Sequence, residues 1–262
     1  MEVVNARKAK LGSDHPDTLS SMANLASTYR NQGRWDEADK LQVDVIIAFK
    51  AKLGSGHPAT LTSMANLSST YWSQGRLDEA EKLQVEVMNA RKVMLGSDHP
   101  ATLTSMANLS STYRNQGRWD EAEKLEVEVM NARKAKLGSD HPDTLSSMAN
   151  LASTYLNQGR WDEAEKLFVE VMNAREAKLG SDHPATLTSM ANLASTYRNQ
   201  GRWDEAEKLE VEVMNVRKAK LGSDHPDTLS SMANLSSSYW SQGRLDEAHA
   251  LLIRKMAGAW QT

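Results

Sequence analysis

The chain lacks several features that would place it in a familiar functional class. Its 262 residues include no cysteine, so disulfides, thiolate nucleophiles and cysteine-based zinc sites are excluded. No apolar run is long enough to span a bilayer, and the first ten residues do not resemble a signal peptide. The formal net charge of −3 gives no basic track for a nucleic acid. We therefore expect a cytoplasmic protein with no nucleic-acid or membrane partner.

The chain consists of one sequence motif that is repeated at a period of 42 residues. All six prolines and all six tyrosines keep that period, and so do two sets of glycines. Such self-similarity is the signature of a repeat architecture, in which each unit packs mainly on its neighbours. The sequence predicts a single all-α solenoid over residues 1–262, with six repeats that start near residues 12, 54, 96, 138, 180 and 222.

Residues that begin and end helices divide each repeat into two helices. In the first repeat, Pro16 suits the first turn of a helix, Asp14 or His15 precedes it as a candidate N-cap, and Gly33 ends it. The second helix begins at the WDEA motif, where Asp36 is the expected cap, and runs to Leu53. Short loops between the helices predict antiparallel packing of consecutive helices.

The two ends of the chain depart from this pattern. Residues 1–11 match the tail of a second helix, which predicts that the chain starts inside a preceding repeat. At the other end Lys255 replaces the valine found at Val213, and Gly258 is expected to interrupt the helix. Residues 249–262 therefore predict a C-terminal cap, and we expect the chain to be the C-terminal part of a longer array.

The motif residues resemble those of the tetratricopeptide repeat. Tyr29, Gly33, Trp35 and Ala38 follow that family's order, with the small Ala26 three residues before the tyrosine. The 42-residue form resembles the repeat of kinesin light chains and the arrays at the C-terminal ends of NACHT- or NB-ARC-type signalling ATPases in fungi and bacteria. The resemblance implies a right-handed superhelix whose first helices line a concave groove that binds extended peptides or a partner's helix. Beside its apolar face, the first helix carries a second stripe that the resemblance assigns to the groove: Ser20, Ala23, Asn24, Ser27, Arg30 and Asn31.

One asparagine recurs in this stripe in every repeat. An asparagine side chain can donate to a carbonyl and accept from an amide at once, so a row of them can hold an extended backbone. The resemblance gives the matching asparagine this role in peptide-binding members. The alternative is that each asparagine ties one helix to the next within the scaffold. The row comprises Asn24, Asn66, Asn108, Asn150, Asn192 and Asn234.

Another groove position varies while its neighbours hardly change. Arginine can form bidentate bonds with a carboxylate, and tryptophan is enriched in binding hot spots, so this position predicts ligand specificity rather than drift. We expect substitutions there to change the ligand and leave the fold intact. The position is occupied by Arg30, Trp72, Arg114, Leu156, Arg198 and Trp240.

Two positions on the second helix complete the pattern. The first varies as well, and its Phe168 either faces the groove or covers the outside of the array. It is occupied by Gln42, Gln84, Glu126, Phe168, Glu210 and Leu252. The second alternates between tryptophan and leucine directly after the loop, and we expect it to be a buried apolar plug. It is occupied by Trp35, Leu77, Trp119, Trp161, Trp203 and Leu245.

No pattern in the sequence indicates catalysis, a cofactor or a metal site. Histidines at equivalent positions of stacked helices lie roughly 8–10 Å apart, too far for one ion. Ser13, Asp14 and His15 match a catalytic triad in composition only, because neighbours on a turn cannot aim at one another. No phosphate-binding loop is present. We expect a non-enzymatic module, possessing no cofactor, that binds a protein or peptide; the alternatives are an array that self-associates through its repeat ends and a spacer between domains.

Overall fold

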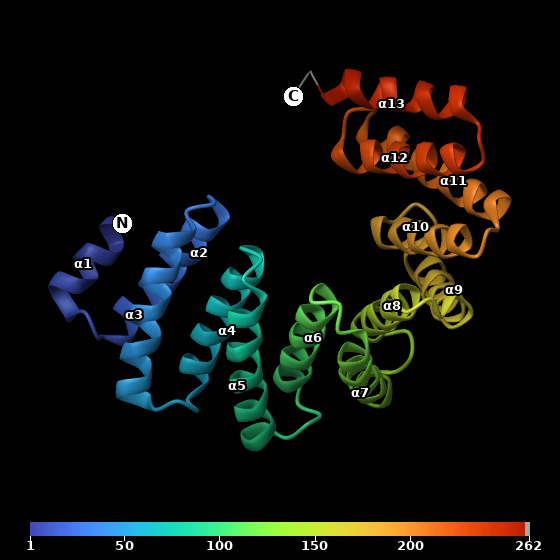
Figure 1. Ribbon diagram of the computed structural model, residues 1–262. Helices are drawn as coiled ribbons and strands as arrows, with labels where there is room; N and C mark the ends of the chain where they lie inside the picture. Colours follow the sequence, from blue (N-terminus) through green and yellow to red (C-terminus); the bar gives the residue numbers. More distant parts are fainter. Residues whose placement is uncertain (260–262) are drawn as a thin grey trace. The chain divides into compact units, whose positions relative to one another are not determined.

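The computed structural model describes residues 1–259, the last six of them by their backbone alone, and over that range it is all helical (Figure 1). The helices alternate between a 16-residue first helix and a 19-residue second helix, as the repeat predicts. The elements are α1 (Glu2–Leu11), α2 (Pro16–Asn31), α3 (Trp35–Leu53), α4 (Pro58–Ser73), α5 (Leu77–Leu95), α6 (Pro100–Asn115), α7 (Trp119–Leu137), α8 (Pro142–Asn157), α9 (Trp161–Leu179), α10 (Pro184–Asn199), α11 (Trp203–Leu221), α12 (Pro226–Ser241) and α13 (Leu245–Ala259).

Each first helix begins and ends at the residues that the sequence marks. The residue before the proline is the N-cap: in α2, His15 accepts a hydrogen bond at Nδ1 from the backbone N–H of Asp17, at 3.2 Å. Pro16 occupies the first turn, where no amide donor is needed. Gly33 adopts φ +73°, and the next amide returns to the carbonyl of Tyr29 at 2.9 Å. The left-handed glycine therefore lets the chain turn sharply into the second helix.

The second helices begin at the WDEA motif, as the sequence indicated, but their N-cap lies two residues before the expected one. Arg34 occupies the N-cap position of α3 and its side chain does not cap the helix. The expected capping role of Asp36 is therefore wrong, because this residue already lies in the first helical turn together with Glu37. Both carboxylates remain near the positive end of the helix dipole, which they stabilise. Gly54 ends α3 with φ +89°, as expected.

The chain forms two compact units, residues 1–132 and 133–262, and within each one consecutive helices pack side by side. In the first unit α2 contacts both α3 and α4, and in the second α10 contacts α8, α9 and α11. First helices are thus neighbours of one another as well as of the second helices. This confirms the prediction of stacked helix pairs and places the first-helix side chains of adjacent repeats next to each other.

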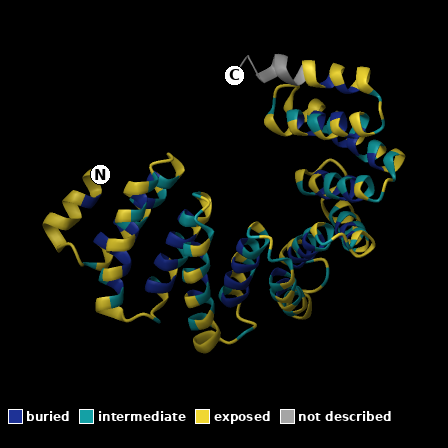
Figure 2. Cartoon of the chain, in the orientation of Figure 1, coloured by how far each residue is buried: buried dark blue, intermediate teal, exposed yellow. Residues whose placement is uncertain are grey.

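Buried residues form a strip along the helices from α2 to α12, which Figure 2 shows in dark blue. The first-helix positions represented by Leu19 and Met22 pack against Val45 of the second helix, with Phe49 added in the first repeat. Met22 and its five counterparts are all buried, which confirms the prediction that these methionines are core residues. Methionine suits this position because its flexible thioether fills irregular gaps between helices.

The predicted apolar plug after the loop is only partly buried. The side chain of Trp161 is 39% exposed and that of Leu245 is 46% exposed, so the prediction of a core position is wrong. The physical reason is its place at the first turn of the second helix, beside the exposed loop glycine. At the C-terminal end, α13 continues through Gly258 to Ala259, so the expected interruption is absent. The predicted cap over residues 249–262 falls partly outside the described residues.

Four loop arginines, Arg76, Arg118, Arg202 and Arg244, connect neighbouring repeats. In the second repeat, the guanidinium of Arg76 lies 4.0 Å from the ring centroid of Tyr71 and pairs with Glu79 in its own helix. It also reaches back to Asp39 of the preceding second helix, at 2.8 Å. Exposed pairs of this kind stabilise by about 1 kcal/mol or less each, and cation–π contacts by about 0.5–1 kcal/mol. Their repetition along the array gives a regular contribution to stacking.

Candidate functional site

The predicted groove stripe lies on the surface of the first helices throughout the described repeats. None of its six positions is buried in any repeat. In the first unit, Arg30 of α2 donates from Nη1 to the hydroxyl oxygen of Ser69 in α4, at 3.2 Å, so the stripes of adjacent repeats are in contact. We call this the first-helix surface; it comprises residues 20, 23, 24, 27, 30 and 31 and their counterparts at multiples of 42.

The six asparagines of this surface hold their side-chain amides free of the scaffold. Asn24, Asn108 and Asn234 are exposed, and Asn66, Asn150 and Asn192 are half-buried. Hydrogen bonds at these residues involve the backbone carbonyl instead: the carbonyl of Asn66 accepts from the hydroxyl of Thr70, at 3.1 Å. The alternative reading, in which each asparagine ties one helix to the next, finds no side-chain hydrogen bond to support it in the described residues. Their donors and acceptors are available to a ligand.

The variable position of the first-helix surface is less free than the sequence suggested. Arg114 places its Nε 3.4 Å from a carboxylate oxygen of Glu126, and Arg198 places its Nε 3.6 Å from Glu210. The arginines are 22% and 24% exposed, and the carboxylates are 3% and 4% exposed. These arginines therefore contact the interior. That substitutions here leave the fold intact stays a prediction, and the contacts with Glu126 and Glu210 argue against it.

The other occupants of this position face outward or pack inward according to their size and polarity. Trp72 is 40% exposed and Trp240 is 57% exposed, the latter with its ring 5.9 Å from that of His249. Leu156 is half-buried and packs in a cluster with Phe168. This position thus shows three distinct environments in one array.

The variable position of the second helix lies beneath the first-helix surface, so we call it the floor position. Phe168 is one of the largest fully buried side chains; it neither faces a groove nor covers the outside, and both readings of the sequence were wrong. Gln42, Gln84, Glu126 and Glu210 are buried as well. Gln42 and Gln84 each accept a hydrogen bond from the first helix of the next repeat, from Thr70 at 3.0 Å and from Thr112 at 2.7 Å.

Burial changes the acid–base behaviour of one floor residue. Desolvation raises the pKa of Glu210 above its ordinary value, because the interior disfavours the charged form. A hydrogen bond from the Ser238 hydroxyl and the charge of Arg198 act in the opposite direction and offset part of this effect. A carboxylate at the floor is therefore held in place by a donor from the next repeat and a cation from its own repeat.

A small hollow opens at the variable position of the second repeat. It has a volume of about 210 Å³ and lies between α4, α5 and α6. Trp72 and Gln84 supply one side and Asn108 of the next repeat the other, with three serines between them: Ser68, Ser69 and Ser111. One residue from each predicted groove row thus meets here, together with a floor residue.

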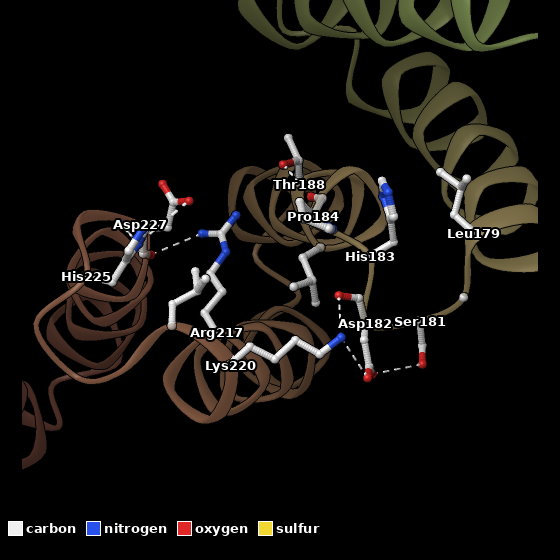
Figure 3. Close-up of a pocket in the computed structure, with 13 residues that line it drawn as sticks. Leu179, Ser181, Asp182, His183, Pro184, Thr188, Arg217, Lys220, His225 and Asp227 are labelled. Atoms are coloured by element: carbon white, nitrogen blue, oxygen red, sulfur yellow. Dashed lines mark hydrogen bonds and ion pairs between the residues drawn. The ribbon is translucent and has the colours of Figure 1, made fainter.

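A larger hollow lies at the loop edge of the second unit, and Figure 3 shows its lining residues. It measures about 690 Å³, yet its charged groups already serve the scaffold. Lys220 points at Asp182, with a nitrogen–oxygen distance of 3.0 Å, and Arg217 donates to the backbone carbonyl of Asp227 (Figure 3). His225 accepts the capping hydrogen bond of α12. We therefore favour the first-helix surface over this hollow, despite the difference in size.

Neither hollow has the arrangement of a metal centre. Over the described residues, no three side chains of histidine, aspartate or glutamate converge as ligands for an ion. Within the same part of the chain, no helix has the length and apolar character that a bilayer crossing requires.

Two features of the site escaped the sequence reading. The floor residue lies twelve positions after its first-helix partner, across a loop, so no helical period connects the two. The loop arginines, represented by Arg76, are identical in every repeat, so no variation marks their role. The sequence does contain a signal for the contact between the surface and floor positions, because the two vary together. Both floor glutamates, Glu126 and Glu210, occur in repeats with arginine at the surface position.

Comparisons with known proteins agree with the repeat reading. The tetratricopeptide repeat family matches residues 17–92, 102–143, 143–219 and 192–254. A crystal structure from Podosopora anserina, described as a kinesin light chain with nearly identical TPR-like repeats, is 32% identical. The alignment covers 79% of this chain and 98% of that one, with a TM-score of 0.71. A search of curated protein sequences found no match.

More distant structures share the fold alone. A signal transduction ATPase from Pyrococcus horikoshii with a tetratricopeptide repeat sensor is 13% identical, with a TM-score of 0.76 over 99% of this chain and 39% of that one. NprR in complex with its cognate peptide NprX is also 13% identical, with a TM-score of 0.66 over 93% of this chain and 67% of that one. The family match over more than half of the chain and the structure at 32% identity together show that the chain belongs to the tetratricopeptide repeat family.

Proposed function

We propose that the chain is a non-enzymatic binding module whose first-helix surface holds an extended peptide. The observation that carries the proposal is the row of asparagine side chains without a partner in the scaffold. Each amide can bond a peptide carbonyl and a peptide N–H together, which suits a backbone whatever its sequence. NprR, a protein of the same fold, was crystallised with its peptide, which supports a peptide as the ligand class.

The chemistry of the surface fits this ligand better than it fits a highly charged one. From residue 18 to residue 31 of the first repeat, and in each counterpart segment, the first helix has no acidic residue. Its only charges are Arg30, Arg114 and Arg198, and two of these lie close to a floor carboxylate. Recognition would therefore rest on hydrogen bonds and on the exposed rings of Trp72 and Trp240.

A larger role follows from the same surface. The similarity to the Pyrococcus horikoshii protein, whose repeats form a sensor, supports the proposal that this array is the sensing part of a signalling protein. In that role, peptide binding on the first-helix surface would be the input, and the response would come from another domain.

The experiment is a selection of displayed random peptides on two variants. In the first, Asn66, Asn108, Asn150 and Asn192 are replaced by alanine. In the matched control, the same change is made at the four exposed second-helix asparagines: Asn89, Asn131, Asn173 and Asn215. We expect a peptide motif on the parent and the control, and none on the first variant. Equal enrichment on both variants contradicts the proposal.

Self-association is the second candidate function. It is favoured by exposed apolar side chains on second helices, where Val93 is 87% exposed and Ile47 is 62% exposed. Such residues on adjacent repeats offer a surface for another copy. Light scattering over a concentration series tests it: a mass that rises with concentration supports assembly, and a constant monomer mass contradicts it.

A further inference from the structure

The two variable positions lie together in four repeats, the second to the fifth, and their occupants there are matched in chemistry. Arginine on the surface lies over glutamate at the floor twice, in Arg114 with Glu126 and in Arg198 with Glu210. Leucine lies with phenylalanine in one cluster, in Leu156 and Phe168. Tryptophan and glutamine line one hollow, in Trp72 and Gln84. A charged floor has a charged partner, and an apolar floor has an apolar one.

We propose that ligand selection in each repeat is encoded by this pair of residues, twelve positions apart, and that the floor residue determines what the surface residue presents. The inference rests on the proposed function, since it names the residues that select the ligand. It differs from the sequence expectation, which assigned selection to the surface position alone.

The contacts explain how the floor exerts its effect. Over Glu126 and Glu210, an arginine turns its Nε to the carboxylate, and less than a quarter of its side chain stays exposed. Over Gln84, the neutral ring of Trp72 is 40% exposed and a hollow lies beside it. Over Phe168, Leu156 packs against the ring. The same backbone position therefore offers an ion pair, a hollow or a flat apolar contact.

The hollow beside Trp72 indicates which ligand side chain the second repeat takes. Its volume is about 210 Å³, which is several times the volume of roughly 30 Å³ that one molecule occupies in liquid water. One wall is an aromatic ring, and the others carry the hydroxyls of serines and the amides of Gln84 and Asn108. An aromatic ligand side chain with a hydrogen-bonding end, such as tyrosine, matches both kinds of wall.

The floor residue also connects each pair to the next repeat. Gln84 accepts a hydrogen bond from Thr112, and Glu210 accepts one from Ser238. A substitution at the floor position therefore alters contacts in two repeats. The choice of side chain there is more constrained than at an exposed position.

The test converts the pair of the second repeat into that of the third. The variants are Trp72→Arg, Gln84→Glu and the double change. The control is Met94→Lys, which also adds one positive charge and copies the third repeat, but at an exposed second-helix position outside the first-helix surface. Gln84→Glu alone places a buried carboxylate under tryptophan, so we expect its midpoint of thermal unfolding to fall by about 4–8 °C. The double variant should regain most of this loss. A loss in the double variant equal to the sum of the single losses overturns the pairing.

Selection of displayed random twelve-residue peptides then tests the ligand. We expect the parent and the Met94→Lys control to select an aromatic residue at one peptide position, and the folded double variant to lose this preference. The same motif on the parent and the double variant overturns the specificity role, while the thermal result still decides whether the residues act together. A parent that enriches no peptide refutes the proposed function and the specificity role with it.

Discussion

The buried carboxylate of Glu210 permits a quantitative test of the floor position. Its replacement by glutamine keeps the shape and the acceptor that the hydroxyl of Ser238 uses. Glutamine is also the natural occupant at Gln42 and Gln84, where the corresponding hydroxyls donate to it. The change therefore removes the charge with little effect on packing.

The expected magnitude follows from the burial of the pair. Replacing both partners of a buried ion pair by apolar groups is often neutral or stabilising by about 1–4 kcal/mol, whereas removing one partner costs about 3–5 kcal/mol when the other charge stays fully buried. Arg198 stays 24% exposed and can be solvated once its partner is neutral. We therefore expect Glu210→Gln to raise the free energy of unfolding at pH 7 by about 1 kcal/mol, near the low end of that range.

The pH dependence gives the sign of the effect. The pKa of Glu210 is raised in the folded state, so the folded protein holds its proton more tightly than the unfolded chain does. The stability that this residue contributes is present below the unfolded pKa and is lost as the pH rises through the folded pKa. The gain from Glu210→Gln should therefore be large at pH 7 and shrink as the pH falls towards 4.

Urea unfolding of the parent and the variant at several pH values between 4 and 7 measures this gain. Glu212→Gln, at an exposed position of the same helix, removes the same charge without the burial and is the matched control. A gain that is equal in both variants, or independent of pH, would refute the reasoning from desolvation.

Three further predictions concern the scaffold, each checked by urea unfolding against the parent. Met148→Ala should lower the free energy of unfolding by about 2–5 kcal/mol, because it opens a cavity at a side chain that is almost fully buried; a loss below 1 kcal/mol would contradict its place in the core. His141→Ala should cost about 1 kcal/mol, because it removes the acceptor for the amide of Asp143, and an unchanged midpoint would show that the cap is dispensable. Gly159→Ala should cost about 1–2 kcal/mol, because this loop glycine has φ +76°, whereas a gain in stability would mean that the turn adopts another conformation.

The helices could be predicted from the sequence because their boundaries are set by local chemistry. Pro16 and its counterparts suit only a first turn, and Gly33 and Gly54 adopt positive φ, so each repeat marks its own starts and stops. The cap at Asp36 was misplaced because Arg34, which carries no capping acceptor, occupies the N-cap position.

The site was only partly predictable because its key contact joins two different helices, the surface position of the first and the floor position of the second. The exposed stripe with Asn24 and Arg30 follows from helical spacing alone. The contact of Arg114 with Glu126 crosses a turn, and its geometry depends on how two helices pack. The partial exposure of Trp161 has a similar cause, since apolar character does not reveal that the first turn of the second helix lies at the edge of the array.

The most direct test of the central claim is a nuclear magnetic resonance titration that follows the asparagine side-chain amides. A peptide enriched on the parent would be added to the ¹⁵N-labelled protein. We predict shifts at the six amides of the first-helix surface, from Asn24 to Asn234, and none at the four second-helix amides from Asn89 to Asn215. Shifts confined to the second-helix amides would contradict peptide binding on the first-helix surface.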